Sequence, residues 1–210
     1  MSRFSIIIPA HNAGGHICNA LDSIINQSFN DYELIVVCDS CSDATESVAQ
    51  SYGAITDNVS FHRDGLTRDH ALTLATGEWI LFMDDDDWFT NPFALQQINS
   101  AIVANPDVDI VAFGVQWPDH TAAPNPRNLF TPRLAHVWDK AWKHTTITKA
   151  NAHFGDAIFC SDTYFLRDMR DAVKAYATIP DALYYYNFRR PGSQTDLFCK
   201  GIIHQSPVAE

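Results

Sequence analysis

Four consecutive carboxylates, Asp84 to Asp87, directly follow an apolar run at residues 79–83. Like charges this close repel one another, and burial at a strand end raises their free energy further. Mg²⁺ or Mn²⁺ relieves such repulsion, because both ions prefer oxygen ligands and bridge carboxylates to substrate phosphates. Side chains alternate in an extended segment, so we expect Asp84 and Asp86 to face one way and Asp85 and Asp87 the other. The segment therefore predicts a metal–diphosphate site; the alternative is a solvated loop or an Asp-capped helix N-terminus.

The elements that must position this turn alternate between strand and helix patterns. β-branched and apolar runs predict strands at 4–8 (closed by Pro9), 33–37, 59–62, 78–83 and 108–115. Helical spacing predicts helices at 14–27, from Ser42 or Asp43 to Tyr52, and at 92–104, and a further helix that ends with residues 71–75 and has Gly77 as C-cap. This alternation indicates βαβ units in a mostly parallel sheet, with ligands at the carboxyl ends of the strands. We therefore expect the loops 9–12, 38–43 and 84–88 to converge.

The pattern changes beyond residue 116. Four prolines and little apolar periodicity predict a long surface loop at 117–132. A helix is expected at 162–173 and a strand at 182–187, followed from Arg189 by a polar tail.

Composition limits the classes of protein that fit. The 210 residues are 46% hydrophobic and 19% charged, which is enough for the core of one domain. The net charge of −11 argues against nonspecific binding to nucleic acid or anionic lipid, and it suits a site that gains positive charge from a metal. No run reaches the length of a membrane span, and the N-terminus lacks a signal-peptide pattern. Five cysteines, an odd number, predict reduced thiols in a cytosolic protein.

A family pattern emerges from the order and spacing of several segments between residues 3 and 195. They read SIIIPAHN at 5–12, ELIVVCDSCSD at 33–43, GLTRDH at 65–70, ATGEW at 75–79, the acidic turn with Trp88, VWDKAW at 137–142, SDTYFLR at 161–167 and YYNFRRPGS at 185–193. Together they resemble the inverting nucleotide-sugar glycosyltransferases of family 2. The resemblance implies an α/β fold of GT-A type, a single Rossmann-like domain with a mostly parallel central sheet and helices on both faces.

The same resemblance implies the activity and the division of the chain. Residues 1–115 would bind the nucleotide sugar, 116–195 would face the acceptor, and 196–210 would form a tail. With Mn²⁺ or Mg²⁺, a sugar would pass from a nucleotide-diphosphate donor, in this reading a UDP-sugar, to a glycan or lipid-linked glycan hydroxyl by direct displacement. The protein would be cytoplasmic, with at most peripheral contact at the inner face of the membrane.

Residue roles follow from the matched motifs. On the donor side, Asp39 would accept the uracil N3–H and Arg68 would reach the diphosphate. The resemblance implies nucleotide-sugar contacts for Pro9, His11, Asn12, Asp39, Arg68, Asp84 and Asp85, and metal ligation by Asp84 and Asp86. Pro9 and His11 would pack against the base. The alternatives are a helix-capping Asp39 and an exposed, structural Arg68.

On the acceptor side, Asp162 is the expected general base, because inversion needs a carboxylate that removes the proton from the attacking hydroxyl. Its alternative is a helix N-cap, and Asp156 is the next candidate base. A sugar platform is expected from Trp138, Trp142 and Tyr164, although such residues also form cores. His144 and His204 are left out of the metal site, because a lone histidine is more often structural.

Departures from the family pattern keep other readings open. They are Cys38, Ser40-Cys41, Asp69-His70 and Ser161, in place of acidic, Gly-Ser, Asn-small and Glu residues. A degenerate domain that binds nucleotide sugar or glycan without turnover is one alternative. A disulfide oxidoreductase using the Cys38–Cys41 pair is another, although it leaves the acidic turn unexplained. A nucleotidyltransferase would need a basic, Gly-rich loop, and Gly14-Gly15 has no Lys or Arg nearby.

Overall fold

The computed structural model describes residues 2–126, 129–130, 136–157, 160–188 and 190–202. Strands and helices alternate through the first part of the chain, as predicted. The elements are β1 (Phe4–Ala10), α1 (Cys18–Ile25), β2 (Tyr32–Asp39), α2 (Thr45–Ser51), β3 (Ile55–Val59), α3 (Asp64–Leu74) and β4 (Trp79–Phe82). The rest of the chain adds β5 (Trp88–Phe89), α4 (Ala94–Ala104), β6 (Ile110–Gln116), β7 (Thr121–Ala122), β8 (Lys140–Lys143), α5 (His144–Ala150), α6 (Asp162–Ala172), β9 (Tyr176–Tyr185) and α7 (Gln194–Cys199).

One sheet joins the strands in the order β3-β2-β1-β4-β8-β6-β9-β5, with β7 paired to β6. The first four strands in this order are parallel. Beyond β4 the sheet is mixed, because β8 runs antiparallel to both β4 and β6, and β5 runs antiparallel to β9. The parallel part places the carboxyl ends of β1, β2 and β4 along one edge, where the predicted site loops follow.

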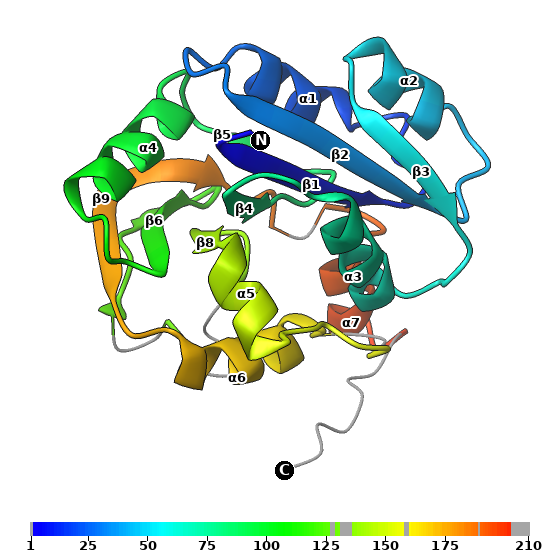
Figure 1. Ribbon diagram of the computed structural model, residues 1–210. Helices are drawn as coiled ribbons and strands as arrows, with labels where there is room; N and C mark the ends of the chain where they lie inside the picture. The colour runs from blue at the N-terminus through cyan, green and yellow to red at the C-terminus, as the bar shows by residue number, and fades with distance from the viewer. Residues whose placement is uncertain (1, 127–128, 131–135, 158–159, 189, 203–210) are drawn as a thin grey trace.

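Helices cover both faces of the sheet (Figure 1). Alternate side chains of β1 point to opposite faces, as the pleat requires. Ile6 and Ile8 pack with residues of α1 and α4, whereas Ile7 packs with residues of α3, α5 and α6. Two apolar cores therefore fix the strand ends from both sides. Among the described residues, no helix is long and apolar enough to cross a bilayer.

Several predicted boundaries were wrong. β3 lies at 55–59 rather than 59–62, because Ile55 to Val59 pair with β2 and residues 60–63 lie outside the strand. α1 begins at Cys18, since residues 14–17 form turns, and α7 falls in the expected polar tail. Gly77 is not the C-cap of α3. It lies so close to β1 that a Cβ would meet Ser5 N at 2.5 Å.

The second half holds elements that the sequence patterns missed. β8 and α5 were not predicted, since Lys140–Lys143 is short and begins with a buried lysine. β9 is longer than expected and runs parallel to β6, with register shifts around Gly114. The expected loop at 117–132 contains the short β7. Residues 127–128 and 131–132 of that loop lie outside the described residues.

Candidate functional site

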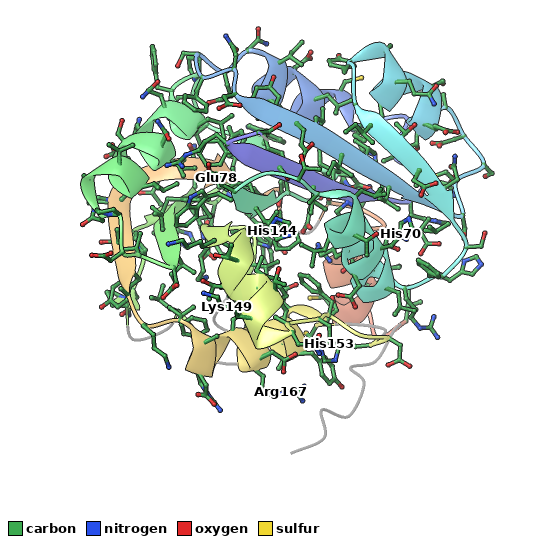
Figure 2. All side chains as sticks on the ribbon, in the orientation of Figure 1. His70, Glu78, His144, Lys149, His153 and Arg167 are labelled. Atoms are coloured by element: carbon green, nitrogen blue, oxygen red, sulfur yellow. The ribbon has the colours of Figure 1, made fainter. Side chains whose placement is uncertain are left out.

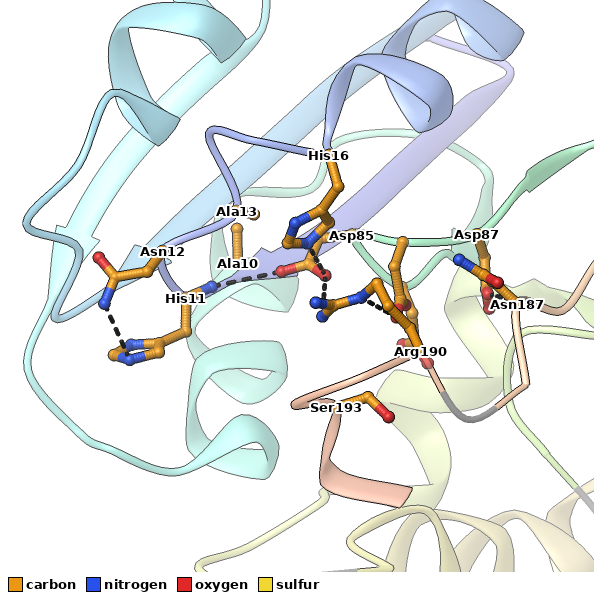
Figure 3. Close-up of polar contacts among 12 residues, drawn as sticks. Ala10, His11, Asn12, Ala13, His16, Asp85, Asp87, Asn187, Arg190 and Ser193 are labelled. Carbon is orange, nitrogen blue, oxygen red and sulfur yellow. Dashed lines mark hydrogen bonds and ion pairs between the residues drawn. The ribbon is translucent and has the colours of Figure 1, made fainter. Parts of the chain in front are cut away.

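The loops that follow β1, β2 and β4 converge, which confirms the placement expected from the strand pattern. His11 Nδ1 lies 2.6 Å from the Asp39 carbonyl oxygen, so Nδ1–H donates between the first two loops. Asn12 accepts a hydrogen bond from the Ser42 N–H at 2.8 Å. The His11 N–H donates to Asp85 Oδ2 at 3.4 Å and joins the third loop (Figure 3).

The acidic segment is a tight turn and not the extended segment that was predicted. The Asp87 N–H donates to the Asp84 carbonyl at 3.2 Å. The strict alternation of side chains was therefore wrong. Asp84 pairs with Arg68, while Asp85 and Asp86 both lie near Arg190, because cations from two different elements attract the carboxylates.

Arg68 lies inside the protein beneath Asp84. One branch of its guanidinium donates to Asp84 Oδ1 at 2.5 Å and the other pairs with Asp64. The residue is 4% exposed, and its Nε has no partner in the described part of the chain. The surrounding protein desolvates Asp84 and raises its pKa to about 7, although Arg68 opposes the shift. Arg68 thus reaches the acidic turn; its contact with a diphosphate stays a prediction.

His16 and Arg190 complete the outer side of the turn, and the sequence analysis had selected neither (Figure 3). His16 Nε2 lies 3.1 Å from Asp85 Oδ1. Arg190 Nε donates to Asp86 Oδ2 at 2.6 Å, and its NH2 lies 3.9 Å from Asp85 Oδ1. Burial raises the pKa of Asp86, and the hydrogen bond from Arg190 opposes that rise. The only available signal for Arg190 was its place in the closing motif at 185–193.

Asp87 anchors the turn to the end of β9. Its carboxyl group accepts hydrogen bonds from Tyr184 Oη at 2.7 Å and from the Asn187 N–H at 2.8 Å. The Asp84 N–H donates to the same Tyr184 oxygen at 3.1 Å. Burial raises the pKa of Asp87 well above its ordinary value. Asp87 is fully buried, so its role is to hold the turn rather than to contact a ligand.

Asp39 has a structural role that the sequence analysis did not foresee. Its carboxylate accepts hydrogen bonds from the backbone N–H groups of Phe61, His62 and Arg63, each at 2.9 Å. The hydroxyl groups of Ser40 and Thr67 donate to it at 2.9 and 3.1 Å. Burial alone would raise its pKa, but these hydrogen bonds hold the pKa below its ordinary value. The carboxylate therefore fixes the segment between β3 and α3, and its contact with uracil stays a prediction.

Asp162 is the first residue of α6 and lies in the same polar cluster as Arg68. Its Oδ2 accepts a hydrogen bond from the Val137 N–H at 3.2 Å. Burial raises its pKa, while attraction to Arg68 and His136 opposes the rise. The residue before it, Ser161, occupies the N-cap position and makes no side-chain capping bond. The Asp162 carboxyl group thus faces the segment before β8 and is close enough to interact with Arg68 and Asp84.

The predicted aromatic platform is wrong as a unit. Trp142 is fully buried and packs edge-on against Phe165 at 5.2 Å, whereas Trp138 belongs to the core on the other face and stacks on Tyr184 at 4.8 Å. Trp138 precedes β8 whereas Trp142 lies in it, and the two side chains belong to different apolar cores. Tyr164 is half-buried, with the Arg167 guanidinium 5.4 Å from its ring. Trp138 does line a cavity of about 200 Å³ with Trp117, His136 and Lys140 among others.

The cysteine pair lacks the character of a redox site. Burial raises the pKa of the Cys38 thiol to about 12, whereas a reactive thiol needs a lowered pKa. Cys41 donates to the Ala10 carbonyl at 3.4 Å and thereby links the first two loops. His144, at the start of α5, lies with Nδ1 2.9 Å from the Gly77 carbonyl (Figure 2). His204 lies outside the described residues.

The acidic turn offers the hard oxygen donors that Mg²⁺ and Mn²⁺ prefer. The described residues contain no cluster of three or more His, Cys, Asp or Glu side chains arranged for a metal ion. Asp84 is already paired with Arg68, and Asp86 with Arg190. The oxygen donors of the turn fit such an ion, which would have to compete with Arg190 for Asp86.

The amino-acid sequence is similar to sequences of known proteins. The model of the family described as Glycosyl transferase family 2 matches residues 5–174. A poly(ribitol-phosphate) beta-glucosyltransferase of Bacillus spizizenii is 33% identical over 106 residues, which cover 46% of this chain and 17% of that protein.

Two solved structures are similar to the whole fold. The crystal structure of S. aureus TarS residues 1–349 with UDP-GlcNAc has a TM-score of 0.81 at 21% identity, covering 92% of this chain and 60% of that chain. The mannosyltransferase PcManGT from Pyrobaculum calidifontis, in complex with GDP-Man and Mn²⁺, has a TM-score of 0.72 at 19% identity, covering 91% and 58%. The GT-A type of fold is thereby confirmed, and the chain spans 60% or less of each of these three proteins.

Proposed function

The chain belongs to glycosyl transferase family 2, and we propose that it transfers a sugar from a UDP-sugar to a glycan hydroxyl with inversion at the anomeric carbon. The observation that carries this proposal is the convergence of three strand-end loops on the acidic turn, with Asp162 in the same polar cluster. The turn offers charge for a diphosphate complex and Asp162 offers a base for an acceptor. Both functions that direct displacement needs are thus held by one cluster.

On the donor side, the nucleoside would lie over the loops after β1 and β2, with the base beside His11 and Asn12. The diphosphate would lie at Asp85 and Asp86, where Arg190 supplies positive charge and His16 contacts Asp85. Asp86, supported by Asp84, would hold Mn²⁺ or Mg²⁺. Such an ion supplies Lewis-acid stabilisation of the departing diphosphate.

On the acceptor side, Asp162 takes the proton of the attacking hydroxyl. The hydroxyl oxygen forms a bond to the anomeric carbon as the bond from that carbon to the diphosphate oxygen breaks, and the nucleoside diphosphate leaves. No covalent intermediate forms, so the configuration inverts. A raised pKa suits this task, because it makes Asp162 a stronger base than an ordinary aspartate.

The acceptor that fits best is a polymer of the cell surface or its lipid-linked precursor. Support comes from the matched relative, whose name describes glucosyl transfer to poly(ribitol-phosphate). The cavity beside the half-buried Trp117 offers aromatic surface for a sugar or polyol on that side of the sheet.

A donor panel tests the proposal. The protein is incubated with UDP-, GDP- and dTDP-sugars, Mn²⁺ and a cell-wall glycan acceptor, and both nucleoside diphosphate release and the anomeric configuration of the product are measured. The proposal expects UDP release and an inverted product. UDP-sugar binding without any transfer would instead support a binding domain that lacks turnover, and a retained configuration would reject direct displacement.

A further inference from the structure

We propose that Asp64 is a positioning residue that joins the acidic turn to the base-bearing helix α6. This inference rests on the proposed function, because it concerns the same transfer site. Asp64 stands at the first position of α3, and its carboxylate contacts groups from both sides of the site. No motif at residues 33–43 or 84–88 includes it.

The first contact is with Arg68, one turn further along α3. One branch of the Arg68 guanidinium pairs with Asp64 and the other with Asp84 at 2.5 Å. A guanidinium held at both branches has a fixed orientation, since its donors form a rigid planar fork. Asp64 therefore determines the direction from which Arg68 approaches the acidic turn.

The second contact reaches α6. Ser161 Oγ donates to Asp64 Oδ2 at 3.2 Å, and Ser161 immediately precedes Asp162. A continuous series of polar contacts thus runs from Asp84 through Arg68 and Asp64 to Ser161. It connects Asp84, which would support the metal ion, with the backbone of the residue that would take the proton.

Close packing supports the same connection. A Cβ at Gly65 would lie 2.9 Å from Ser161 Cβ and 3.1 Å from Phe154 Cβ, so the start of α3 presses directly on this part of the chain. Asp69, further along α3, accepts hydrogen bonds from the Phe154 and Gly155 N–H groups at 2.8 and 2.9 Å. The first turns of α3 are therefore fixed to the segment that leads into α6.

Charge explains why a carboxylate is needed at this place. Arg68 is buried and attracts Asp64, Asp84 and Asp162. Without Asp64, the guanidinium would interact with Asp84 and Asp162 alone, and this would displace the Asp162 carboxylate from its position for proton removal. A displacement of about 1 Å lowers a reaction rate by about 10²-fold, because the attacking and leaving groups lose alignment.

The test compares Asp64→Ala, Asp64→Asn and the double variant Asp64→Ala with Ser161→Asp. We expect Asp64→Ala to lower kcat by about 10²-fold while the Kd for UDP stays within about threefold of wild type. Ser161→Asp should restore most of kcat, because Ser161 Oγ lies near the position of the lost carboxylate and Asp also suits an N-cap. Asp57→Ala is the matched control. Asp57, in β3, pairs with His70 of α3, which Figure 2 labels, so this variant also removes an acidic partner of α3 but should leave kcat unchanged.

Two results would overturn the inference. One is wild-type kcat in Asp64→Ala; the other is a folded Asp64→Ala with lowered kcat that Ser161→Asp does not restore. If Asp64→Ala fails to fold, Asp64→Asn, which keeps the shape and removes the charge, must show the lowered kcat. Absence of transfer by the wild type rejects the proposed function instead. In that case the contact between Asp64 and Ser161 is tested by melting temperature. The losses caused by Asp64→Asn and by Ser161→Ala must not add up in the double variant.

Discussion

Asp162 is the residue on which the proposed chemistry depends most directly. Asn in its place keeps the shape and the hydrogen bond from Val137 but cannot take a proton. We therefore expect Asp162→Asn to lower kcat by about 10²–10⁴-fold, the usual range for general-base catalysis, with little change in the Kd for UDP. Steady-state kinetics and calorimetry on this one variant measure both quantities.

The pH profile gives an independent reading of the same residue. The base works when deprotonated, so a pKa raised by burial moves the acid limb of kcat/KM for the acceptor above the ordinary aspartate value of 3.8. Asp162→Asn should lose this limb. Full activity in Asp162→Asn, or an unchanged acid limb, would remove Asp162 from the mechanism and make Asp156 the next candidate.

Substitution of Asp39 distinguishes a structural role of this residue from a role in nucleotide recognition. Asp39→Ala should lower the free energy of unfolding by about 1–3 kcal/mol, because three part-buried backbone N–H groups lose their acceptor. If Asp39 also accepts the uracil N3–H, UDP binding should weaken by about 1.5–3 kcal/mol and GDP binding much less. Calorimetry with both nucleotides decides: equal losses for UDP and GDP would leave Asp39 only its structural role.

Residue identities were easier to predict than residue contacts. Asp39, Asp84 and Asp162 stand directly at strand or helix ends, where local patterns and motif spacing point. His16, Arg190 and Asp64 could not be found in this way, because each has a contact, with Asp85, Asp86 and Ser161 respectively, that lies 69, 104 and 97 positions away in the chain. Such pairings depend on how the sheet brings distant loops together, which no local pattern records.

At the scale of elements, the acidic turn and the segment after β9 act as one unit. The Asn187 N–H donates to Asp87 and Arg190 pairs with Asp86, so Asp86 already has a positive partner without a metal. Removal of Arg190 should free Asp86 for a cation. We expect Arg190→Ala to bind Mn²⁺ more tightly than wild type in nucleotide-free calorimetry, because the competing guanidinium is gone.

The same variant should bind UDP more weakly without metal, since a cation near the diphosphate is lost. Lys200→Ala is a suitable control, because its ammonium pairs with Asp196 and not with the turn. Mn²⁺ affinity in Arg190→Ala equal to or weaker than that of wild type would show that Arg190 does not compete for the metal site.

The elements that were missed share a physical cause. β8 is four residues long and places Lys140 at a fully buried position, where its ammonium contacts Asp139 and the His136 carbonyl. A charged residue in so short a run gives no strand signal. The first four parallel strands were predictable, because their apolar runs are buried on both faces.

The whole molecule places the loops after β1, β2 and β4 on the parallel part of the sheet and Asp162 on α6, which packs against the same face as α3. The net charge is −11 and four adjacent carboxylates lie at the acidic turn, so a diphosphate bound there would need positive charge from neighbouring groups. Arg68 and Arg190 would supply part of that charge. A metal ion would supply the rest, which makes metal dependence the property that tests the account as a whole.

The most direct measurement is UDP release from a UDP-sugar and acceptor as Mn²⁺ is titrated, for wild type and Asp86→Ala side by side. The account predicts release that rises with Mn²⁺ and stops in EDTA, and a kcat at least about 10²-fold lower in Asp86→Ala at every Mn²⁺ concentration. The variant should melt no lower than wild type, because removing one of four adjacent carboxylates relieves repulsion. UDP release by the wild type that EDTA does not change, or near-normal turnover in a folded Asp86→Ala, would contradict metal dependence through Asp86.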